Sequence, residues 1–262
     1  ESYSVTALVR NENVSLPVPV NRVIAELSGL ARRDIGILSG VDVVVHAAAR
    51  AHIMRDEVAD PLAEYRKVNR DSTLALARMA AKSGVKRFVF VSSVKVNGEM
   101  TRPDHSFSAS DEYVPTDPYG LSKYEAEQCL LALAKETGMQ VVIIRPPLVY
   151  GPSVKGNFAS MVNWVKKGIP LPLGAVHNQR SLVALNNLVD FIALCADREK
   201  SPKAANEVFL ISDGQDVSTT ELLRKVAKSQ NKQAWLIPIP VWLMKFSAKV
   251  VGKEELTDRL FG

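Results

Sequence analysis

The stretch Arg87-Phe-Val-Phe-Val-Ser-Ser93 joins an apolar run to two hydroxyl side chains. Two other runs have the same form: Val41 to Val45 leads into His46-Ala-Ala-Ala49, and Met139 to Ile144 leads into Arg145-Pro-Pro. Short apolar runs of this kind are typical of strands that are buried on both faces of a parallel sheet. Ligands of open α/β sheets bind beyond the carboxyl ends of such strands. The small and polar residues after these runs therefore indicate where a ligand would bind.

Helical patterns alternate with the strand-like runs. A helix is predicted from Pro61 to about Ser83, with Asp60 as its N-cap, a proline in its first turn and a glycine just past its end. A second begins near Asp117-Pro118 with the same signature and ends before Gly138. Strands that alternate with helices favour βαβ units. We therefore predict an α/β fold with a doubly wound parallel sheet.

After Gly151 the alternation loosens, and this half of the chain is predicted to form a smaller lobe. Residues 157–167 have a helical pattern, and Ser218 to Ser229 is predicted to be a helix that opens with a capping box, Ser218-Thr-Thr-Glu221. The predicted domains are therefore residues 1–150 and residues 151–262.

Composition narrows the class of protein. The 262 residues are 47% hydrophobic and 23% charged, which is ordinary for a globular protein. Cys129 and Cys195 lie in apolar helical contexts and indicate no disulfide framework, so a reducing, cytoplasmic location is expected. We expect no membrane span, because no apolar run is long enough. The formal charge of +5 is not clustered with aromatic residues, so nucleic acid is not an expected partner.

The histidines give no sign of a metal site or of a hydrolase. His46, His52, His105 and His177 show no metal-ligand spacing, and no Ser-His-Asp order accompanies a nucleophile elbow. No metal is therefore predicted.

The pentapeptide Tyr119-Gly-Leu-Ser-Lys123 carries the strongest chemical signal. A tyrosine and a lysine four residues apart share one face of a helix. A nearby ammonium favours the phenolate form of tyrosine, and this would move the pKa of Tyr119 from about 10 toward the range useful for general acid–base catalysis. The spacing alone is weak evidence, because ordinary amphipathic helices also produce it.

In combination, these motifs make the chain similar to the extended short-chain dehydrogenases/reductases, specifically the NAD-dependent epimerase/dehydratase family that acts on nucleotide-activated sugars. The resemblance rests on residues 41–49, Asn69, residues 91–93, the Tyr119/Lys123 pair and Arg145-Pro-Pro-Leu-Val-Tyr-Gly-Pro152. It implies a catalytic hydroxyl at Ser93, an acid/base at Tyr119 and a ribose-binding lysine at Lys123. It also implies a dinucleotide-binding first domain and a substrate-binding second lobe, partly interleaved around residues 182–197 and 209–211.

The expected cofactor is NAD or NADP. By the resemblance its contacts would include Ala47, Ala48, Ala49, Asn69, Ser92, Tyr119, Lys123 and Pro146. Arg10 follows the first apolar run, where an acidic residue would favour NAD and an arginine accommodates the 2′-phosphate of NADP. The alternative reading of Arg10 is a solvated surface side chain.

The resemblance also suggests contacts to a UDP-sugar substrate, at Lys95, Asn157 and Arg180. An arginine fork suits phosphate oxygens, which favours a diphosphate partner for Arg180. Two of these have a simpler alternative: Lys95 can be solvated, and Asn157 can cap the helix that follows it. Leu148 departs from the family pattern, in which an asparagine often contacts the phosphate.

The family also begins with a strand and a glycine-rich turn, and no G-x-G-x-x-G or G-x-x-G-x-x-G spacing occurs in this sequence. Tyr3 to Arg10 resembles the second strand of the family, so we expect the sequence to begin after that loop.

The activity implied is 4-epimerisation of a UDP-hexose or UDP-N-acetylhexosamine by hydride transfer at C4. Two alternatives stay open: a 4-reductase of UDP-4-keto-6-deoxy sugars in surface-polysaccharide synthesis, and a non-catalytic nucleotide-binding scaffold. Val94-Lys95 stands where 4,6-dehydratases carry an Asp-Glu pair, which disfavours dehydration. Similar proteins often form homodimers, and a homodimer is possible here.

Overall fold

The computed structural model describes residues 3–17, 19–27, 29, 35–51, 58–102, 105–152 and 156–250. The chain folds into two compact units, and each is assembled from separate stretches of sequence. The first unit consists of Glu1–Gly98, Ser108–Arg145 and Phe191–Phe209, and the second of Glu99–Phe107, Pro146–Asp190 and Leu210–Gly262.

The first unit holds most of the strands. Its first elements are β1 (Thr6–Val9), β2 (Asn21–Ile24), the 3-10 turn η2 (Ile35–Leu38) and β3 (Val43–His46). They are followed by α1 (Pro61–Tyr65), the π-helical η3 (Arg66–Asp71), α2 (Ser72–Lys82), β4 (Arg87–Val91) and the 3-10 turn η4 (Val94–Val96). The unit is completed by α3 (Pro118–Thr137), β5 (Gln140–Arg145), the end of α5 (Leu185–Ala196), the 3-10 turn η5 (Pro202–Ala204) and most of β8 (Val208–Leu210).

A four-stranded sheet in the order β3-β4-β5-β8 forms the centre of this unit. Both β3 and β5 run parallel to β4, and the register pairs His46 with Phe90 and Val91 with Ile144. The carboxyl ends of these three strands therefore meet at one edge of the sheet. The strands β1 and β2 form a separate parallel pair. The α/β class with parallel strands is confirmed.

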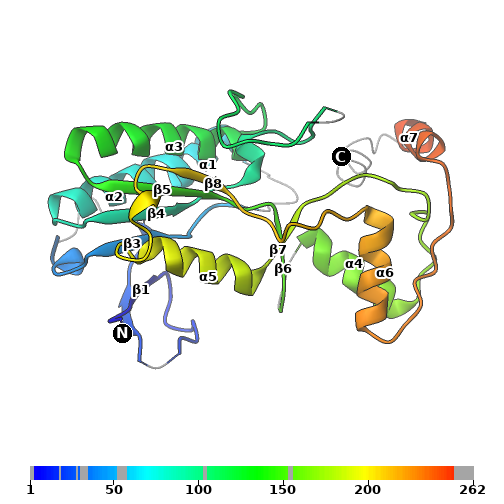
Figure 1. Cartoon of the computed structure of the whole chain (residues 1–262), viewed down its shortest axis with the longest axis horizontal. Coiled ribbons are helices and arrows are strands. Elements are labelled where there is room, and N and C mark those ends of the chain that lie inside the picture. Colours follow the sequence, from blue (N-terminus) through cyan, green and yellow to red (C-terminus); the bar gives the residue numbers. More distant parts are fainter. Residues whose placement is uncertain are drawn as a thin grey trace. The chain divides into compact units, whose positions relative to one another are not determined.

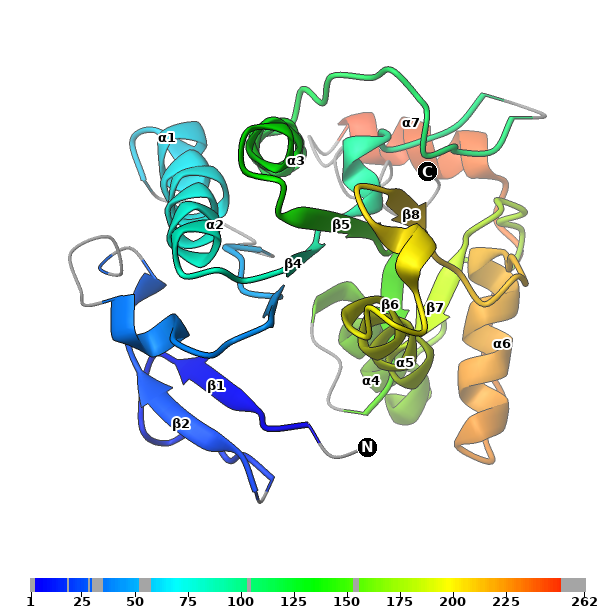
Figure 2. The same cartoon turned by 60° about the vertical axis from the view of Figure 1, so that its left-hand side comes forward.

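Helices cover both faces of the four-stranded sheet, as Figures 1 and 2 show for α1 to α3 on one side and α5 on the other. Phe88 and Phe90 of β4 belong to a core cluster that also includes Leu130 of α3 and Ala77 of α2. Between them, Val89 is equally inaccessible to solvent and faces the opposite side. Burial on both faces explains why β4 is a continuous apolar run instead of an alternating one.

The predicted helix from Pro61 to Ser83 is present but not uniform. Asp60 caps it, accepting a hydrogen bond from the Ala63 backbone N–H at 3.0 Å. The π-helical η3 interrupts it and carries Asn69. Single π turns inside α-helices are frequent at functional sites, and a periodicity argument does not detect them.

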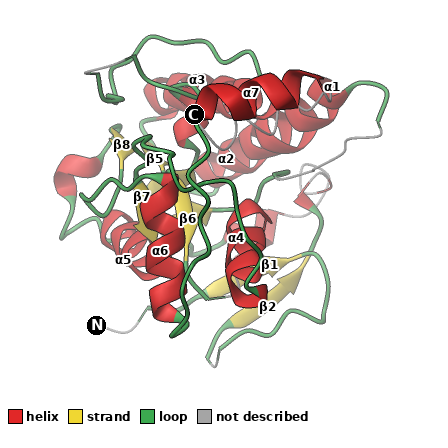
Figure 3. Ribbon diagram, turned by 90° about the vertical axis from the view of Figure 1, so that its right-hand side faces the viewer, coloured by secondary structure: helices red, strands yellow, loops and turns green. Residues whose placement is uncertain are grey.

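The second unit contains the remaining elements: β6 (Leu148–Tyr150), α4 (Gly156–Lys167), β7 (Leu182–Ala184), the start of α5, α6 (Thr219–Ser229) and α7 (Val241–Val250). The strands β6 and β7 form a short parallel pair, with α4 and α6 beside it in Figure 3. Phe158 of α4 and Leu223 of α6 belong to one buried core cluster. The predicted capping box at Ser218 and Glu221 is confirmed, with both reciprocal hydrogen bonds formed.

Candidate active site

The end of β4 places Ser92 and Ser93 at the carboxyl edge of the sheet. Ser92 is buried, whereas Ser93 is half-buried and caps the short η4 turn. The Ser93 hydroxyl accepts a hydrogen bond from the Lys95 backbone N–H at 3.3 Å. The turn thus fixes the backbone direction directly after the strand.

The first turn of α3 brings Tyr119 to the same edge. Asp117 caps the helix, its carboxylate accepting a hydrogen bond from the Gly120 N–H at 2.9 Å, and Pro118 occupies the first turn. A Cβ atom at Gly120 would lie 2.5 Å from the Asp117 carboxylate and 3.1 Å from the Lys95 carbonyl oxygen. Glycine is therefore required for the start of α3 to approach the loop after β4 this closely.

Lys123 is fully enclosed, with 1% of its surface exposed. Its Nζ donates a hydrogen bond to the carbonyl oxygen of Val91 at 2.7 Å and lies 3.9 Å from the centroid of the Phe90 ring. Burial lowers the pKa of Lys123 to about 7, and the charge of Glu127 partly opposes this. The ammonium therefore ties α3 to the end of β4.

Tyr119 is half-buried, and its ring meets the edge of Tyr65 with the centroids 6.0 Å apart. Burial raises the pKa of its phenol, although a hydrogen bond with the Ser93 side chain acts in the opposite direction. The prediction that Lys123 lowers the pKa of Tyr119 is wrong for the free chain. The Lys123 ammonium is engaged with the strand carbonyl, so desolvation dominates the titration of the phenol.

Asn69 cross-links the elements around this site. Its amide oxygen accepts a hydrogen bond from the Arg50 N–H at 2.8 Å, and its Nδ2 donates to the Arg50 carbonyl oxygen at 3.1 Å and to Ser122 Oγ at 3.0 Å. The side chain thereby joins the loop after β3 to α3. It is 1% exposed, so its role in this structure is to hold the loop.

His46 lies beneath the site and is neutral. Burial, with a smaller contribution from the charge of Lys123, lowers the pKa of His46 to about 3. Its Nε2 and the hydroxyl of Thr73 are 2.9 Å apart, and its ring stacks on Phe90. These contacts are those of a core residue.

Sequence reasoning missed a buried polar cluster behind the two serines. The guanidinium of Arg145 forms an ion pair with Glu127 at 2.6 Å and donates to the side chain of Asn97 at 3.0 Å. The hydroxyl of Ser92 donates to Glu127 at 2.5 Å. The signal available in the sequence was that Glu127 lies one helical turn beyond Lys123 on the same face of α3.

The other predicted cofactor contacts are located as follows. Arg10 is exposed directly after β1, and Ala47, Ala48 and Ala49 are exposed directly after β3. Small exposed residues at the carboxyl edge of a parallel sheet fit the close approach of a dinucleotide, so the residues present suit this cofactor. Pro146 is half-buried between β5 and β6.

The predicted substrate contacts are spread over both units. Lys95 lies in η4 of the first unit, whereas Asn157 and Arg180 belong to the second. Arg180 is half-buried, and burial lowers its pKa. Its backbone pairs with that of Val217. Asn157 falls in the first turn of α4, and its side chain lies outside the described residues.

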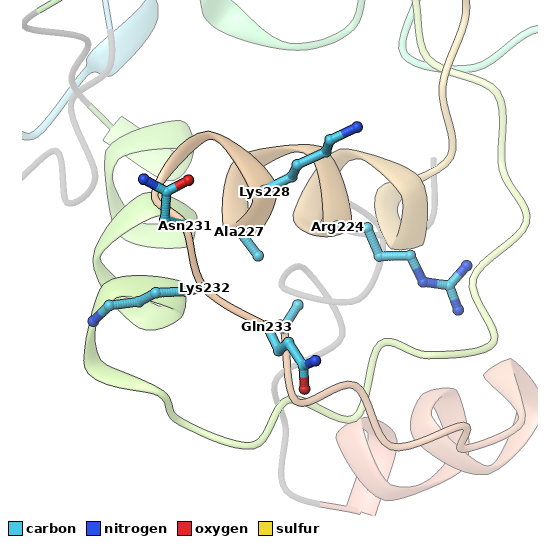
Figure 4. Close-up of a pocket in the computed structure, with 7 residues that line it drawn as sticks. Arg224, Ala227, Lys228, Asn231, Lys232 and Gln233 are labelled. Atoms are coloured by element: carbon cyan, nitrogen blue, oxygen red, sulfur yellow. The ribbon is translucent and has the colours of Figure 1, made fainter.

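One surface hollow of about 440 Å³ lies in the second unit, and none of the predicted site residues lines it. It is lined by three basic side chains, Arg224, Lys228 and Lys232, together with Ala227, Asn231, Gln233 and Ala234 (Figure 4). Among the described parts of the chain, no group of three acidic, histidine or cysteine side chains is arranged to hold a metal ion. Likewise, no helix in those parts is long and apolar enough to cross a bilayer.

The chain has clear similarity to known proteins. A model of the NAD-dependent epimerase/dehydratase family matches residues 1–211. A UDP-glucose 4-epimerase of Vibrio cholerae is 55% identical over 226 residues, which are 86% of this chain and 68% of that protein. An N-acetyl-α-D-glucosaminyl-diphospho-ditrans,octacis-undecaprenol 4-epimerase of Escherichia coli O157:H7 is 30% identical over 83% of this chain and 65% of its own length.

A solved structure shows the same fold. The UDP-glucose 4-epimerase of Thermotoga maritima, determined with UDP-glucose, matches 91% of this chain and 79% of its own with a TM-score of 0.73 and 24% identity. The chain spans about two thirds of the length of the two sequence relatives.

Proposed function

The chain belongs to the NAD-dependent epimerase/dehydratase family, and we propose that it is a nucleotide-sugar 4-epimerase that acts on a UDP-hexose or a UDP-N-acetylhexosamine. The observation that carries this proposal is the placement of Ser93, at the end of β4, beside the first turns of α3, which carry Tyr119 and the Lys123 that donates to the Val91 carbonyl oxygen. The 55% identity to a UDP-glucose 4-epimerase over most of the chain supports the same substrate class.

NAD, when bound, supplies a hydride acceptor and a positive charge. Ala47 to Ala49, Tyr119 and Lys123 are the residues proposed to hold it, and we propose that the first unit is the dinucleotide-binding unit and the second the sugar-nucleotide-binding unit. A cation near the phenol favours the phenolate, which would offset the raised pKa of Tyr119 in the free chain.

Tyr119 is proposed to take the proton of the sugar 4-hydroxyl. It would return the proton after the 4-keto intermediate has rotated and has taken back the hydride on its other face. Ser93 is proposed to share the hydrogen bond to the sugar oxygen. Lys123, anchored on the Val91 carbonyl, keeps the first turn of α3 against the strand. In the second unit, Arg180 and Asn157 are the residues proposed to contact the nucleotide diphosphate, and Lys95 is proposed to contact the hexose.

The test is product analysis of the full-length protein with UDP-glucose, UDP-galactose and their N-acetylated counterparts, without added cofactor. We expect interconversion of C4 epimers, no turnover for Tyr119→Phe, and normal turnover for the control Tyr124→Phe on the same helix. Nicotinamide binding by Tyr119→Phe should be retained, because the substitution removes a single hydroxyl. An inactive unaltered protein, or an active Tyr119→Phe variant, would contradict the proposal.

Two separate measurements distinguish the alternatives. A 4-reductase would consume one reduced cofactor per product with a UDP-4-keto-6-deoxy sugar, whereas a scaffold would keep its biological activity when Tyr119 is changed to Phe. Arg10, exposed at the end of β1, supports a second test: parallel titrations with NAD(H) and NADP(H). A strong preference for NAD(H) would contradict the role predicted for this arginine.

A further inference from the structure

A buried ion pair joins α3 to the end of β5 behind the candidate site. Glu127 is in α3 and Arg145 ends β5, and they are 0% and 5% exposed. The Arg145 Nε lies 3.1 and 3.2 Å from the two carboxylate oxygens, and Nη2 lies 2.6 Å from Oε2. Removing two charges from water costs about as much as their attraction returns. Net stability is therefore a weak explanation for this pair.

The ion pair holds the segment that follows β4 at both of its ends. At the start, the Ser92 hydroxyl donates to Glu127 Oε1 at 2.5 Å. At the other end, Arg145 Nη1 donates to Asn97 Oδ1 at 3.0 Å. The Asn97 amide then donates to the Ser108 carbonyl oxygen at 2.6 Å. Ser93 lies inside this doubly held segment.

The same pair is also connected to the helix side of the site. Glu127 follows Lys123 by one turn of α3, and the Lys123 Nζ is bound to the Val91 carbonyl oxygen directly before Ser92. The charged and titratable groups that interact with the Lys123 ammonium are His46 of β3 and Glu127 of α3. The Glu127 carboxylate is thus connected both to the end of β4 and to the helix that carries Tyr119.

We propose that Glu127 and Arg145 are positioning residues, which hold Ser93 against Tyr119 by clamping residues 92–97 to α3. This inference rests on the proposed function for its kinetic consequence. The geometric consequence, a fixed separation of the Ser93 and Tyr119 hydroxyls, does not depend on it.

The decisive variant is the double substitution Glu127→Leu/Arg145→Met, which removes both charges together and replaces them by apolar side chains. Such replacements are often neutral for stability, so a purely structural pair predicts a folded enzyme with normal kcat. A positioning pair predicts a folded protein whose kcat falls about 10- to 100-fold while KM changes less than about threefold, because the clamp is lost. The matched control is Glu125→Leu/Arg66→Met, which removes a partly exposed ion pair between α3 and η3 and should leave kcat within about twofold.

A folded double variant with kcat within about twofold of the unaltered protein would overturn the proposal. If the double variant does not fold, Asn97→Ala decides in its place, since it cuts the clamp at one end without leaving a charge unpaired. Crystal structures supply the readout that is independent of turnover: the distance between the Ser93 and Tyr119 hydroxyls should be larger in the variant than in the unaltered protein. An unchanged separation refutes the positioning role, whereas an inactive unaltered protein refutes the proposed function alone.

Discussion

The buried charge of Lys123 is expected to destabilise the folded protein. Its ammonium is 1% exposed, and burial lowers its pKa from 10.5 to about 7. The Lys123→Met substitution keeps most of the aliphatic chain in place and removes the charge. We therefore expect a chain that is more stable than the unaltered one near neutral pH and that has lost turnover.

The size of the effect follows from the pKa. A fall from 10.5 to about 7 corresponds to roughly 5 kcal/mol against the charged form in the folded state. The variant also leaves the Val91 carbonyl oxygen without its donor, which costs about 1–3 kcal/mol. A net gain of about 2–4 kcal/mol therefore remains at and below pH 7.

The free energy of unfolding is expected to depend on pH in a definite direction. Between pH 7 and 10.5 the unfolded chain holds a proton on Lys123 that the folded chain has released, so the stability of the unaltered protein rises with pH in this window. By pH 9.5 only about 1–2 kcal/mol of the penalty is left. The advantage of Lys123→Met should thus shrink by about 3 kcal/mol between pH 7 and 9.5.

The assay is urea unfolding of both proteins, without cofactor, at pH 7 and pH 9.5. The control is Lys135→Met, an exposed lysine on the same helix, for which a change within about 0.5 kcal/mol at both pH values is expected. A Lys123→Met variant that is less stable than the unaltered chain at pH 7, by an amount that does not vary with pH, would refute the reasoning.

Three further substitutions test the local geometry. Gly120→Ala should cost about 1–3 kcal/mol in urea unfolding, because the new Cβ would displace the cap at Asp117. Asn69→Leu should cost about 2–4 kcal/mol, since the Arg50 N–H and carbonyl lose their partners; unchanged protection of the Arg50 amide in hydrogen exchange would contradict this. Arg87→Met should lower the free energy of unfolding by about 2–5 kcal/mol, because the guanidinium donates to the Cys195 and Ser201 carbonyls across the sheet; a chemical denaturation curve that superposes on the unaltered one would disprove it.

Much of the fold was predictable because it depends on local signals. The strands β3, β4 and β5 are apolar runs of the right length, and the caps at Asp60, Asp117 and Ser218 are all formed. These features depend on residues close in the sequence, so a pattern indicates them directly. The π-helical η3 was not predictable in this way, because its residues have no pattern distinct from that of the α-helix around it.

The candidate site also has features that could be predicted from the sequence and features that could not. Tyr119, Lys123 and Ser93 could be selected from the sequence because the helical spacing of Tyr119 and Lys123, taken together with the strand end at Ser93, resembles the pattern of a known family. The pKa of Tyr119 could not be predicted from the sequence, since it depends on the desolvation of the phenol and on the direction in which the Lys123 ammonium points. Glu127 and Arg145 gave no signal strong enough to pair them, because they are 18 positions apart and meet only when α3 lies along β5.

The order of residues in this chain indicated its main helices and the strands of its parallel sheet, since these follow from short-range periodicity and capping, and the resemblance to a known family selected Tyr119 as the candidate proton-transfer group. Tertiary structure alone decided which charges are buried, which carbonyl the Lys123 ammonium reaches, and which distant side chains hold Ser93 in place. The physical reason is that desolvation and hydrogen-bond geometry depend on the surroundings of a group in space, and packing brings those surroundings together from remote parts of the sequence.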